Sequence, residues 1–158
     1  MPLRPAFYGR VMREAARSTA MTLIGAPLRD PIDEPEYQRI FSLMARERVE
    51  ALMVNDHPAN YAYRRLIAEL ALRVRLPAIA ALRDFPEAGG LMAYAADTLA
   101  IFRSMAQYTD RILKGARPGD LPFQEPTKYE LVINLKTAKA LGLTIPPSLL
   151  LRADQVIE

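Results

Sequence analysis

Apolar residues in the first half of the chain alternate between helical spacing and short continuous runs. Three segments carry apolar residues three or four positions apart and predict helices, at residues 6–19, about 33–46 and about 60–73. The short apolar runs between and after them predict buried strands at Met21–Gly25, Ala51–Val54 and Leu76–Leu82. Continuous apolar strands that alternate with helices are typical of a parallel sheet covered on both faces. The pattern therefore predicts an α/β fold with a doubly wound, mostly parallel sheet.

The second predicted helix has a recognisable start. Asp33 can accept a hydrogen bond from a free backbone N–H of the first turn, and Glu36 stands where it would close a capping box. The apolar face that follows is expected to point into the core and consists of Tyr37, Ile40, Phe41 and Met44.

The alternation of predicted helices and strands changes after residue 84. A turn containing Gly89 and Gly90 is followed by a brief predicted strand, Leu91–Tyr94, and Asp97 is placed to cap a long helix that reaches about Lys114. One side of this helix is apolar and comprises Leu99, Phe102, Met105, Ala106, Thr109 and Ile112. The proline-rich run that follows predicts an extended linker.

The tail combines a strand and two helices with clear boundary signals. Tyr129–Ile133 is β-branched and apolar, as strands are, and Asn134 is a good N-cap for the helix that follows. Gly142 stands where a left-handed C-cap belongs, and Pro146 and Pro147 can open a last short helix.

Composition narrows the possible chemistry. The 158 residues are 51% apolar and 25% charged, an ordinary globular balance, and one domain is expected. Cysteine is absent, which excludes disulfides and thiolate chemistry, and the single histidine makes a zinc site unexpected. No cofactor or metal is predicted. The net charge of +3 comes from arginines interleaved with acids, which favours a solvated mixed surface over a nucleic-acid partner.

No apolar run is long enough for a transmembrane helix. The first 20 residues carry arginines throughout and lack the apolar core of a secretory signal peptide. A chain made as written would therefore be expected in the cytoplasm.

Five short stretches together resemble a known family. They are the tail run ELVINLKTAKALGLTIPPSLLLRAD (130–154) and the runs at 75–79, 87–92, 112–118 and 120–122. Their order and spacing closely resemble ABC-transporter substrate-binding proteins of the tryptophan/tyrosine type, which are two-lobed periplasmic receptors of the type I periplasmic-binding fold. The resemblance implies a binding protein for a small organic solute, such as an amino acid, that works with an ABC permease in the periplasm and is not an enzyme.

The family's mature protein is about twice as long, and this chain resembles its second half. The resemblance implies that residues 1–84 form the core of the C-terminal lobe and that residues 126–158 return to complete it. Residues 85–125 would cross between lobes, with helix 97–114 belonging to the missing N-terminal lobe. Hinge crossings are expected near residues 4–8, 82–90 and 120–125. A half-length form would present half of the ligand contacts and lose high affinity.

An alternative function belongs to another class of protein. The chain could be a free-standing, one-lobe interaction or regulatory module that forms a homodimer through helix 97–114.

Candidate ligand contacts follow the second predicted strand, because ligands of open α/β sheets sit beyond the carboxyl ends of the strands. These candidates are Asn55, Asp56, His57, Asn60 and Tyr61. A carboxylate such as Asp56 could accept a hydrogen bond from an amino group or hydroxyl of a ligand. Asp56 and Asn60 could equally cap the next helix, and the two roles are compatible. No serine or cysteine nucleophile is paired with His57, so it is interpreted as a surface histidine.

Three further residues are candidates for the hinge and cleft rim: Arg83, Phe85 and Tyr94. Ordinary packing at the hinge is the favoured interpretation of all three. Where the family often has a glycine after the tyrosine that corresponds to Tyr94, this chain has Ala95 and Ala96. A turn at that position would have to avoid positive φ.

Overall fold

The computed structural model describes the backbone of residues 5–158 and the side chains of residues 9–158. Its centre is a five-stranded sheet in which the strands follow one another in chain order. The strands are β1 (Leu52–Val54), β2 (Ala78–Ala80), β3 (Met92–Ala96), β4 (Tyr129–Asn134) and β5 (Gln155–Ile157). The first three strands are parallel, β4 runs antiparallel to β3, and β5 is parallel to β4. The predicted α/β fold with a mostly parallel sheet is confirmed.

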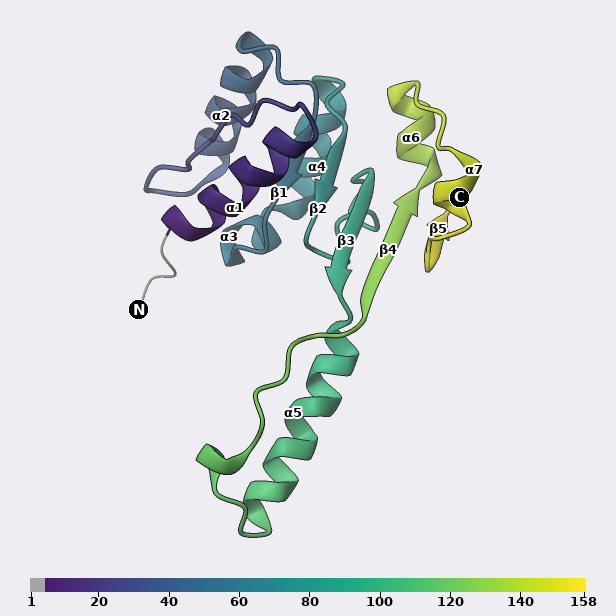
Figure 1. Cartoon of the computed structure of the whole chain (residues 1–158). Coiled ribbons are helices and arrows are strands. Elements are labelled where there is room, and N and C mark those ends of the chain that lie inside the picture. Colours follow the sequence, from purple (N-terminus) through teal and green to yellow (C-terminus); the bar gives the residue numbers. More distant parts are fainter. Residues whose placement is uncertain (1–4) are drawn as a thin grey trace.

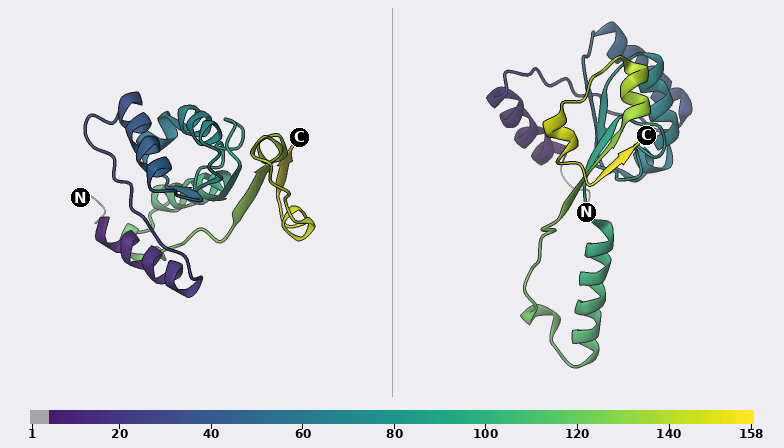
Figure 2. Two further views of the ribbon diagram at one scale, coloured as in Figure 1. Left: turned by 90° about the horizontal axis from the view of Figure 1, so that it is seen from above. Right: turned by 90° about the vertical axis from the view of Figure 1, so that its right-hand side faces the viewer.

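Helices lie on both faces of the sheet, as Figure 2 (right) shows. One face is covered by α2 (Glu34–Arg46), α4 (Arg64–Arg73) and α6 (Leu135–Leu141), and the other carries α1 (Pro5–Ser18) and α7 (Pro147–Leu150). The short helix α3 (Pro58–Ala62) directly precedes α4. The second face is less well covered, since Met53 of β1 and Tyr94 of β3 remain exposed.

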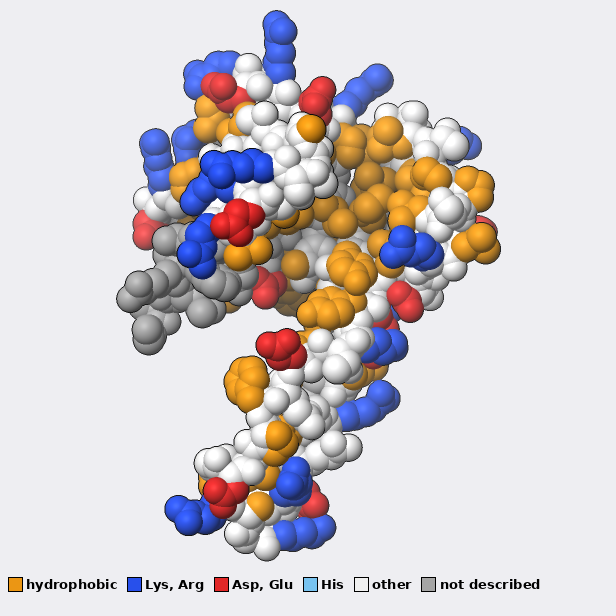
Figure 3. All heavy atoms as spheres, viewed as in Figure 1, with side chains coloured by type: hydrophobic (Ala, Val, Ile, Leu, Met, Phe, Trp, Pro, Cys, Tyr) orange, Lys and Arg blue, Asp and Glu red, His pale blue; other side chains and the backbone are white. Residues whose placement is uncertain are grey.

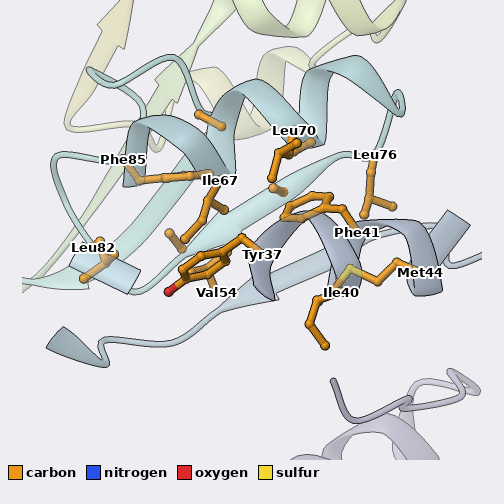
Figure 4. Packing of buried hydrophobic residues seen from close by; sticks show 14 residues of the cluster. Tyr37, Ile40, Phe41, Met44, Val54, Ile67, Leu70, Leu76, Leu82 and Phe85 are labelled. Atoms are coloured by element: carbon orange, nitrogen blue, oxygen red, sulfur yellow. The ribbon is translucent and has the colours of Figure 1, made fainter. Parts of the chain in front are cut away.

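The main core lies between α2, α4 and the first two strands (Figure 4). The predicted inward face of α2 is fully buried there. The residues of β2 and β3 that face these helices are small: Ala78, Ala80 and Ala93. Their short side chains let the helices approach the sheet closely, while larger side chains from the helices fill the space between the layers.

Asn134 joins the tail to the rest of the sheet. Its side-chain oxygen accepts a hydrogen bond from the N–H of Thr137 at 3.0 Å, so it caps α6 as predicted. Its side-chain amide donates to the carbonyl of Pro86 at 2.9 Å, and its own N–H donates to Leu91 O at 2.8 Å. Gly142 ends the helix with φ of 74°, which confirms the predicted left-handed C-cap.

The helix α5 (Thr98–Leu113) projects from the body together with its return segment, which contains the 3₁₀ turn η1 (Pro118–Asp120) (Figure 1). Asp97 caps α5 as predicted, with its carboxylate accepting from Ala100 N–H at 2.9 Å. The return segment follows one side of the helix through hydrogen bonds from Tyr108 to Pro122 O and between Ser104 and Gln124. No residue of α5 is buried.

The positions at which the chain leaves and re-enters the body differ from those predicted. The strand β3 pairs with both β2 and β4, so residues 92–96 lie inside the sheet. The chain leaves the body after Ala96 and returns at Tyr129, rather than near 82–90 and 120–125. Of the crossing expected at 4–8, residue 4 lies outside the described residues, and the backbone of 5–8 forms the first turn of α1. Assignment of the segments to two lobes stays a prediction.

Two local predictions are wrong. Met21–Gly25 forms no strand, and Met21, Leu23 and Ile24 are 64, 43 and 50% exposed, because no neighbouring strand offers these residues a hydrogen-bonded ladder. Ala95 and Ala96 form no turn, because they continue β3 in register with β4. The strand β5 is an element that the sequence pattern does not predict.

Gly90 is required by close packing. A Cβ at this position would lie 2.7 Å from Cζ of Phe85 and closer still to Cε1, and this ring is fully buried and cannot move aside. At Gly25, in contrast, no atom lies within 4 Å of the place that a Cβ would take.

Gly90→Ala should therefore lower the free energy of unfolding by about 1–3 kcal/mol, the usual cost of overpacking a core. Gly25→Ala is the matched control and should leave it nearly unchanged. Urea denaturation of the three proteins measures the difference. Equal midpoints for Gly90→Ala and the parent protein would contradict the packing seen around Phe85.

Glu36 fastens the loop before α2 to that helix. Asp33 caps the helix by accepting from Glu36 N–H at 3.1 Å, as predicted. The Glu36 carboxylate does not complete the capping box; it accepts from Arg29 N–H at 2.7 Å and from the Arg39 guanidinium at 2.6 Å. The Arg39 hydrogen bonds are the main cause that lowers the pKa of Glu36 from 4.5 to about 2, against the opposing effect of burial.

Because this pKa is lower in the folded chain, the unfolded chain binds more protons between about pH 4.5 and 2. The free energy of unfolding should fall as the pH falls through that window. Glu36→Gln should flatten the fall, and Arg39→Gln should flatten it in the same way by returning the pKa of Glu36 toward 4.5. Urea midpoints measured from neutral pH downward test this, and an unchanged slope in both variants would exclude it.

Candidate functional site

Polar and aromatic side chains gather at the end of the sheet that faces α5. The carboxyl ends of β1, β2 and β3 and the amino end of β4 meet there, because β4 runs antiparallel to its neighbour. We call this surface the strand-end rim, and it comprises residues 55–61, Asp84, Tyr94 and Tyr129. It lies where the body meets the projecting helix in Figure 1.

A buried hydrogen-bond chain fixes the turn after β1. The Tyr37 hydroxyl donates to Asn60 Oδ1 at 2.8 Å, and Asn60 Nδ2 donates to Asn55 Oδ1 at 2.7 Å. Burial is the main cause that raises the pKa of Tyr37, which therefore remains a donor. The two asparagines are thus used to shape the turn, and Asn60 is buried.

His57 and Asp56 have separate roles at the surface of this turn. His57 Nδ1 accepts from Ala59 N–H at 3.2 Å, so the histidine caps α3. Asp56 does not cap the helix; it is exposed and makes no side-chain hydrogen bond to any described residue. Its carboxylate is therefore the acceptor of this turn that remains open to a ligand.

Tyr61 forms a second polar group on the rim. Its hydroxyl donates to Asp84 Oδ2 at 3.3 Å, and the Arg64 guanidinium lies 4.5 Å from the centre of its ring. The tyrosine is still 47% exposed, so part of its ring and the Asp84 carboxylate face solvent.

An aromatic pair completes the rim. Tyr94 of β3 stacks on Tyr129 of β4, with ring centres 5.5 Å apart and planes at 17°. Both rings are about half exposed. Phe85 departs from its predicted place on the rim, because its side chain is fully buried beneath Gly90.

Arg83 stabilises the rim from the side. Its guanidinium donates to Glu130 Oε2 at 2.9 Å, to Glu87 Oε1 at 3.0 Å and to Gln155 Oε1 at 2.7 Å. Glu87 lies in the same turn after β2, Glu130 lies on β4 and Gln155 lies on β5, so the arginine joins this turn to both strands. It is a positioning residue here, because each of its three side-chain nitrogens donates to one of these partners.

The same ionic network reaches the start of α5. Lys128 Nζ lies 2.9 Å from the Asp97 carboxylate and 3.5 Å from Glu130. The hydrogen bond from Ala100 N–H, followed by that from Lys128, lowers the pKa of Asp97. This buried carboxylate thus stays charged at neutral pH and fastens α5 to the first residues of β4.

The rim is an open surface. The body contains a small cavity between α4 and α6, away from the rim, which is lined by Gly89, Leu91 and Thr137 among others. Its volume of about 10 Å³ has room for no more than one water. No three His, Cys, Asp or Glu side chains among the described residues lie close enough to hold a metal ion. The arrangement can therefore contact one side of a small molecule with carboxylates and aromatic rings.

Two rim residues, Asp84 and Tyr129, are absent from the candidates that the sequence offers, as is Arg64, which lies against the Tyr61 ring. Asp84 comes shortly after the third predicted strand, so the rule used for Asn55 and Asp56 could have found it. Tyr129 could not be found in this way, because its place beside Tyr94 depends on the antiparallel register of β3 and β4.

An α/β lobe with ligand-type side chains at its strand ends is one half of the architecture of two-lobed solute-binding proteins. A model of the ABC transporter substrate binding protein family matches residues 10–157. The chain belongs to that family. A search of curated proteins found no match.

Solved structures with the same fold confirm the architecture. A conserved domain protein from Vibrio cholerae O1 biovar El Tor has a TM-score of 0.84 at 23% identity, and the match covers 94% of this chain and 49% of that protein. The ABC domain from Streptococcus pneumonia in complex with L-Trp has a TM-score of 0.80 at 25% identity, with coverages of 94% and 52%. A ligand-free, open substrate-binding protein with adhesive properties from Clostridium difficile has a TM-score of 0.68 at 17% identity, with coverages of 99% and 52%. The chain spans about half the length of these structures.

No helix within residues 5–158 is long and apolar enough to cross a membrane.

Asp97→Ala should loosen the first turn of α5, because it removes both the helix cap and the partner of Lys128. The amide of Ala100 should then exchange with solvent about fivefold faster. Asp97→Asn keeps a cap acceptor and should exchange at an intermediate rate. Since the pKa of Asp97 is lowered by folding, the difference between the parent and Asp97→Asn should disappear as the pH falls through that pKa. Identical exchange in Asp97→Ala and the parent would contradict this role.

Proposed function

We propose that this chain provides the second lobe of the substrate-binding component of an ABC importer for a small organic solute, with an amino acid as the leading class. The observation that supports it is the strand-end rim, where Asp56, Tyr61 and Asp84 lie on one open surface with the Tyr94–Tyr129 pair. A structural relative contains L-Trp.

The chemistry of the rim fits an amino acid with an apolar side chain. The open Asp56 carboxylate can accept hydrogen bonds from an ammonium group, and hydrogen bonds to charged groups contribute about 1.5–3 kcal/mol. The exposed faces of Tyr94 and Tyr129 can pack on an apolar or aromatic side chain, which contributes about 0.5–1.5 kcal/mol beyond area burial.

The proposed form is half of a receptor. Two-lobed receptors close around their ligand by hinge bending, and each lobe supplies part of the contacts. The rim alone leaves one side of the ligand in water, so high affinity requires a first lobe. In a full-length receptor the periplasm would be the compartment and a membrane permease the partner. The chain performs no reaction in this proposal, since His57 caps α3 instead of activating a nucleophile.

Two-dimensional NMR of the chain with a panel of amino acids that includes L-tryptophan tests the proposal. At millimolar ligand, the backbone signals of residues 55–61 and Tyr94 should shift. Asp56→Ala should remove the shifts, while Asp120→Ala, an exposed acid on η1, should leave them unchanged.

Two results would contradict different parts of the proposal. Absence of shifts at the rim with every member of the panel would exclude an amino-acid ligand for this lobe. Isothermal titration that finds micromolar or tighter binding by this chain alone would exclude the half-site interpretation.

A further inference from the structure

The projecting helix α5 meets the body beside a group of charged side chains. One hydrogen bond beyond the paired residues of β3 and β4 runs from Asp97 N–H to Lys128 O, and the two chain segments part after it. Figure 3 shows that the projecting unit meets the body in a narrow neck, where side chains of both charges lie at the surface. We call four residues at this place the joint: Arg83, Asp97, Lys128 and Glu130. Their contacts run without a break from the first turn of α5 to the turn after β2.

Both carboxylates of the joint are held by one oxygen and offer the other to Lys128. Asp97 Oδ1 accepts from Ala100 N–H at 2.9 Å, which ties this carboxylate to the first turn of α5. Glu130 Oε2 accepts from the Arg83 guanidinium at 2.9 Å, which ties this carboxylate to the body. The Lys128 ammonium lies 2.9 Å from Asp97 Oδ2 and 3.5 Å from Glu130 Oε1. One ammonium therefore bridges a carboxylate of the projecting helix and a carboxylate of the sheet.

The bridge resists a change in the direction of α5. The Asp97 and Glu130 side chains are only 8% and 18% exposed, so their charges are poorly screened by water. The hydrogen bond to Asp97 raises the pKa of Lys128, which therefore remains charged. Because Asp97 is bonded to the first turn of the helix, turning α5 carries its carboxylate along and opens the contact with Lys128. The two sheltered carboxylates then lose the cation that lies between them.

The rest of the projecting unit supplies little that could fix this direction. No residue of α5 is buried. The return segment makes its side-chain hydrogen bonds to the helix itself, from Ser104 to Gln124 and from Tyr108 to Pro122 O. The helix and its return segment are therefore linked to each other, and the charged contacts at the joint link this unit to the body.

We propose that Lys128 fixes the direction of α5 relative to the body by bridging the carboxylates of Asp97 and Glu130. Its wider role rests on the proposed function. In a two-lobed receptor α5 would lie beyond the hinge, with the first lobe. Lys128 would then restrain how far that lobe stands open above the strand-end rim.

Distances between two spin labels measure the direction of α5 without any ligand. The parent has no cysteine, so Arg111→Cys on α5 and Arg73→Cys on α4, both at exposed positions, place one label on each side of the joint. Turning a helix of about 24 Å by about 20° moves its far end by about 8 Å, which pulsed electron paramagnetic resonance resolves. The labelled parent should give one narrow distance distribution. Lys128→Met should broaden it, with the fraction at the parent distance falling about fivefold.

Three comparisons separate the bridge from a general loss of charge. Lys136→Met removes an exposed lysine of α6 and should leave the distribution unchanged. Lys128→Arg keeps a cation at the joint and should keep the distribution narrow. In about 1 M salt the labelled parent should broaden toward the Lys128→Met result, because the Lys128 side chain is 58% exposed and ions screen charges beyond about 3 Å.

A narrow distribution in Lys128→Met, or a parent at low salt that is as broad as this variant, would overturn the proposal. If Lys128→Met loses the circular dichroism of the parent, the parent in high salt takes its place, and a distribution that salt leaves unchanged would overturn it. Failure here is distinct from failure of the proposed function, because the label distances are measured without solute and solute binding is measured by shifts at the rim.

Discussion

The antiparallel pairing of β3 with β4 is the constraint on which the rest of the structure depends. Five residue pairs join the two strands, and one further hydrogen bond runs from Asp97 N–H to Lys128 O where they end. These two strands connect the parallel half of the sheet to the tail. They are also the two connections between the body and α5. The position of the projecting helix and the meeting of polar groups at the rim therefore have the same cause.

Charged groups stabilise the pairing of β3 with β4. At the end of the two strands the buried carboxylate of Asp97 pairs with Lys128. A buried carboxylate without partners is costly, and Asp97 is compensated by a helix N-terminus and by Lys128. Glu130 extends the contact to Arg83, which in turn reaches β5. The rim, the start of α5 and the last strand are thereby held by one ionic network, much of it sheltered from solvent.

The features that were predictable from the sequence are those with local causes. The caps at Asp33, Asp97, Asn134 and Gly142 depend on residues within one helical turn, and all four form as expected. The failures depend on distant partners. An apolar run such as Met21–Gly25 becomes a strand only if a ladder receives it, and the burial of Phe85 depends on how closely Gly90 approaches its ring. Of the predicted contact residues, Asp56, Tyr61 and Tyr94 face solvent, while Asn55 and Asn60 serve the turn.

The rim and the apolar side of α5 are open for the same physical reason. Both lie on the α5 side of the β3–β4 pair, where the chain supplies one layer and nothing among the described residues supplies a second. Asp97 and Lys128 fix the start of α5 to the first residues of β4 beside the rim, while no residue of the helix itself is buried. The joint between α5 and the body is therefore held by polar contacts at one end of the helix, and the rest of its surface is left to solvent in this part of the chain.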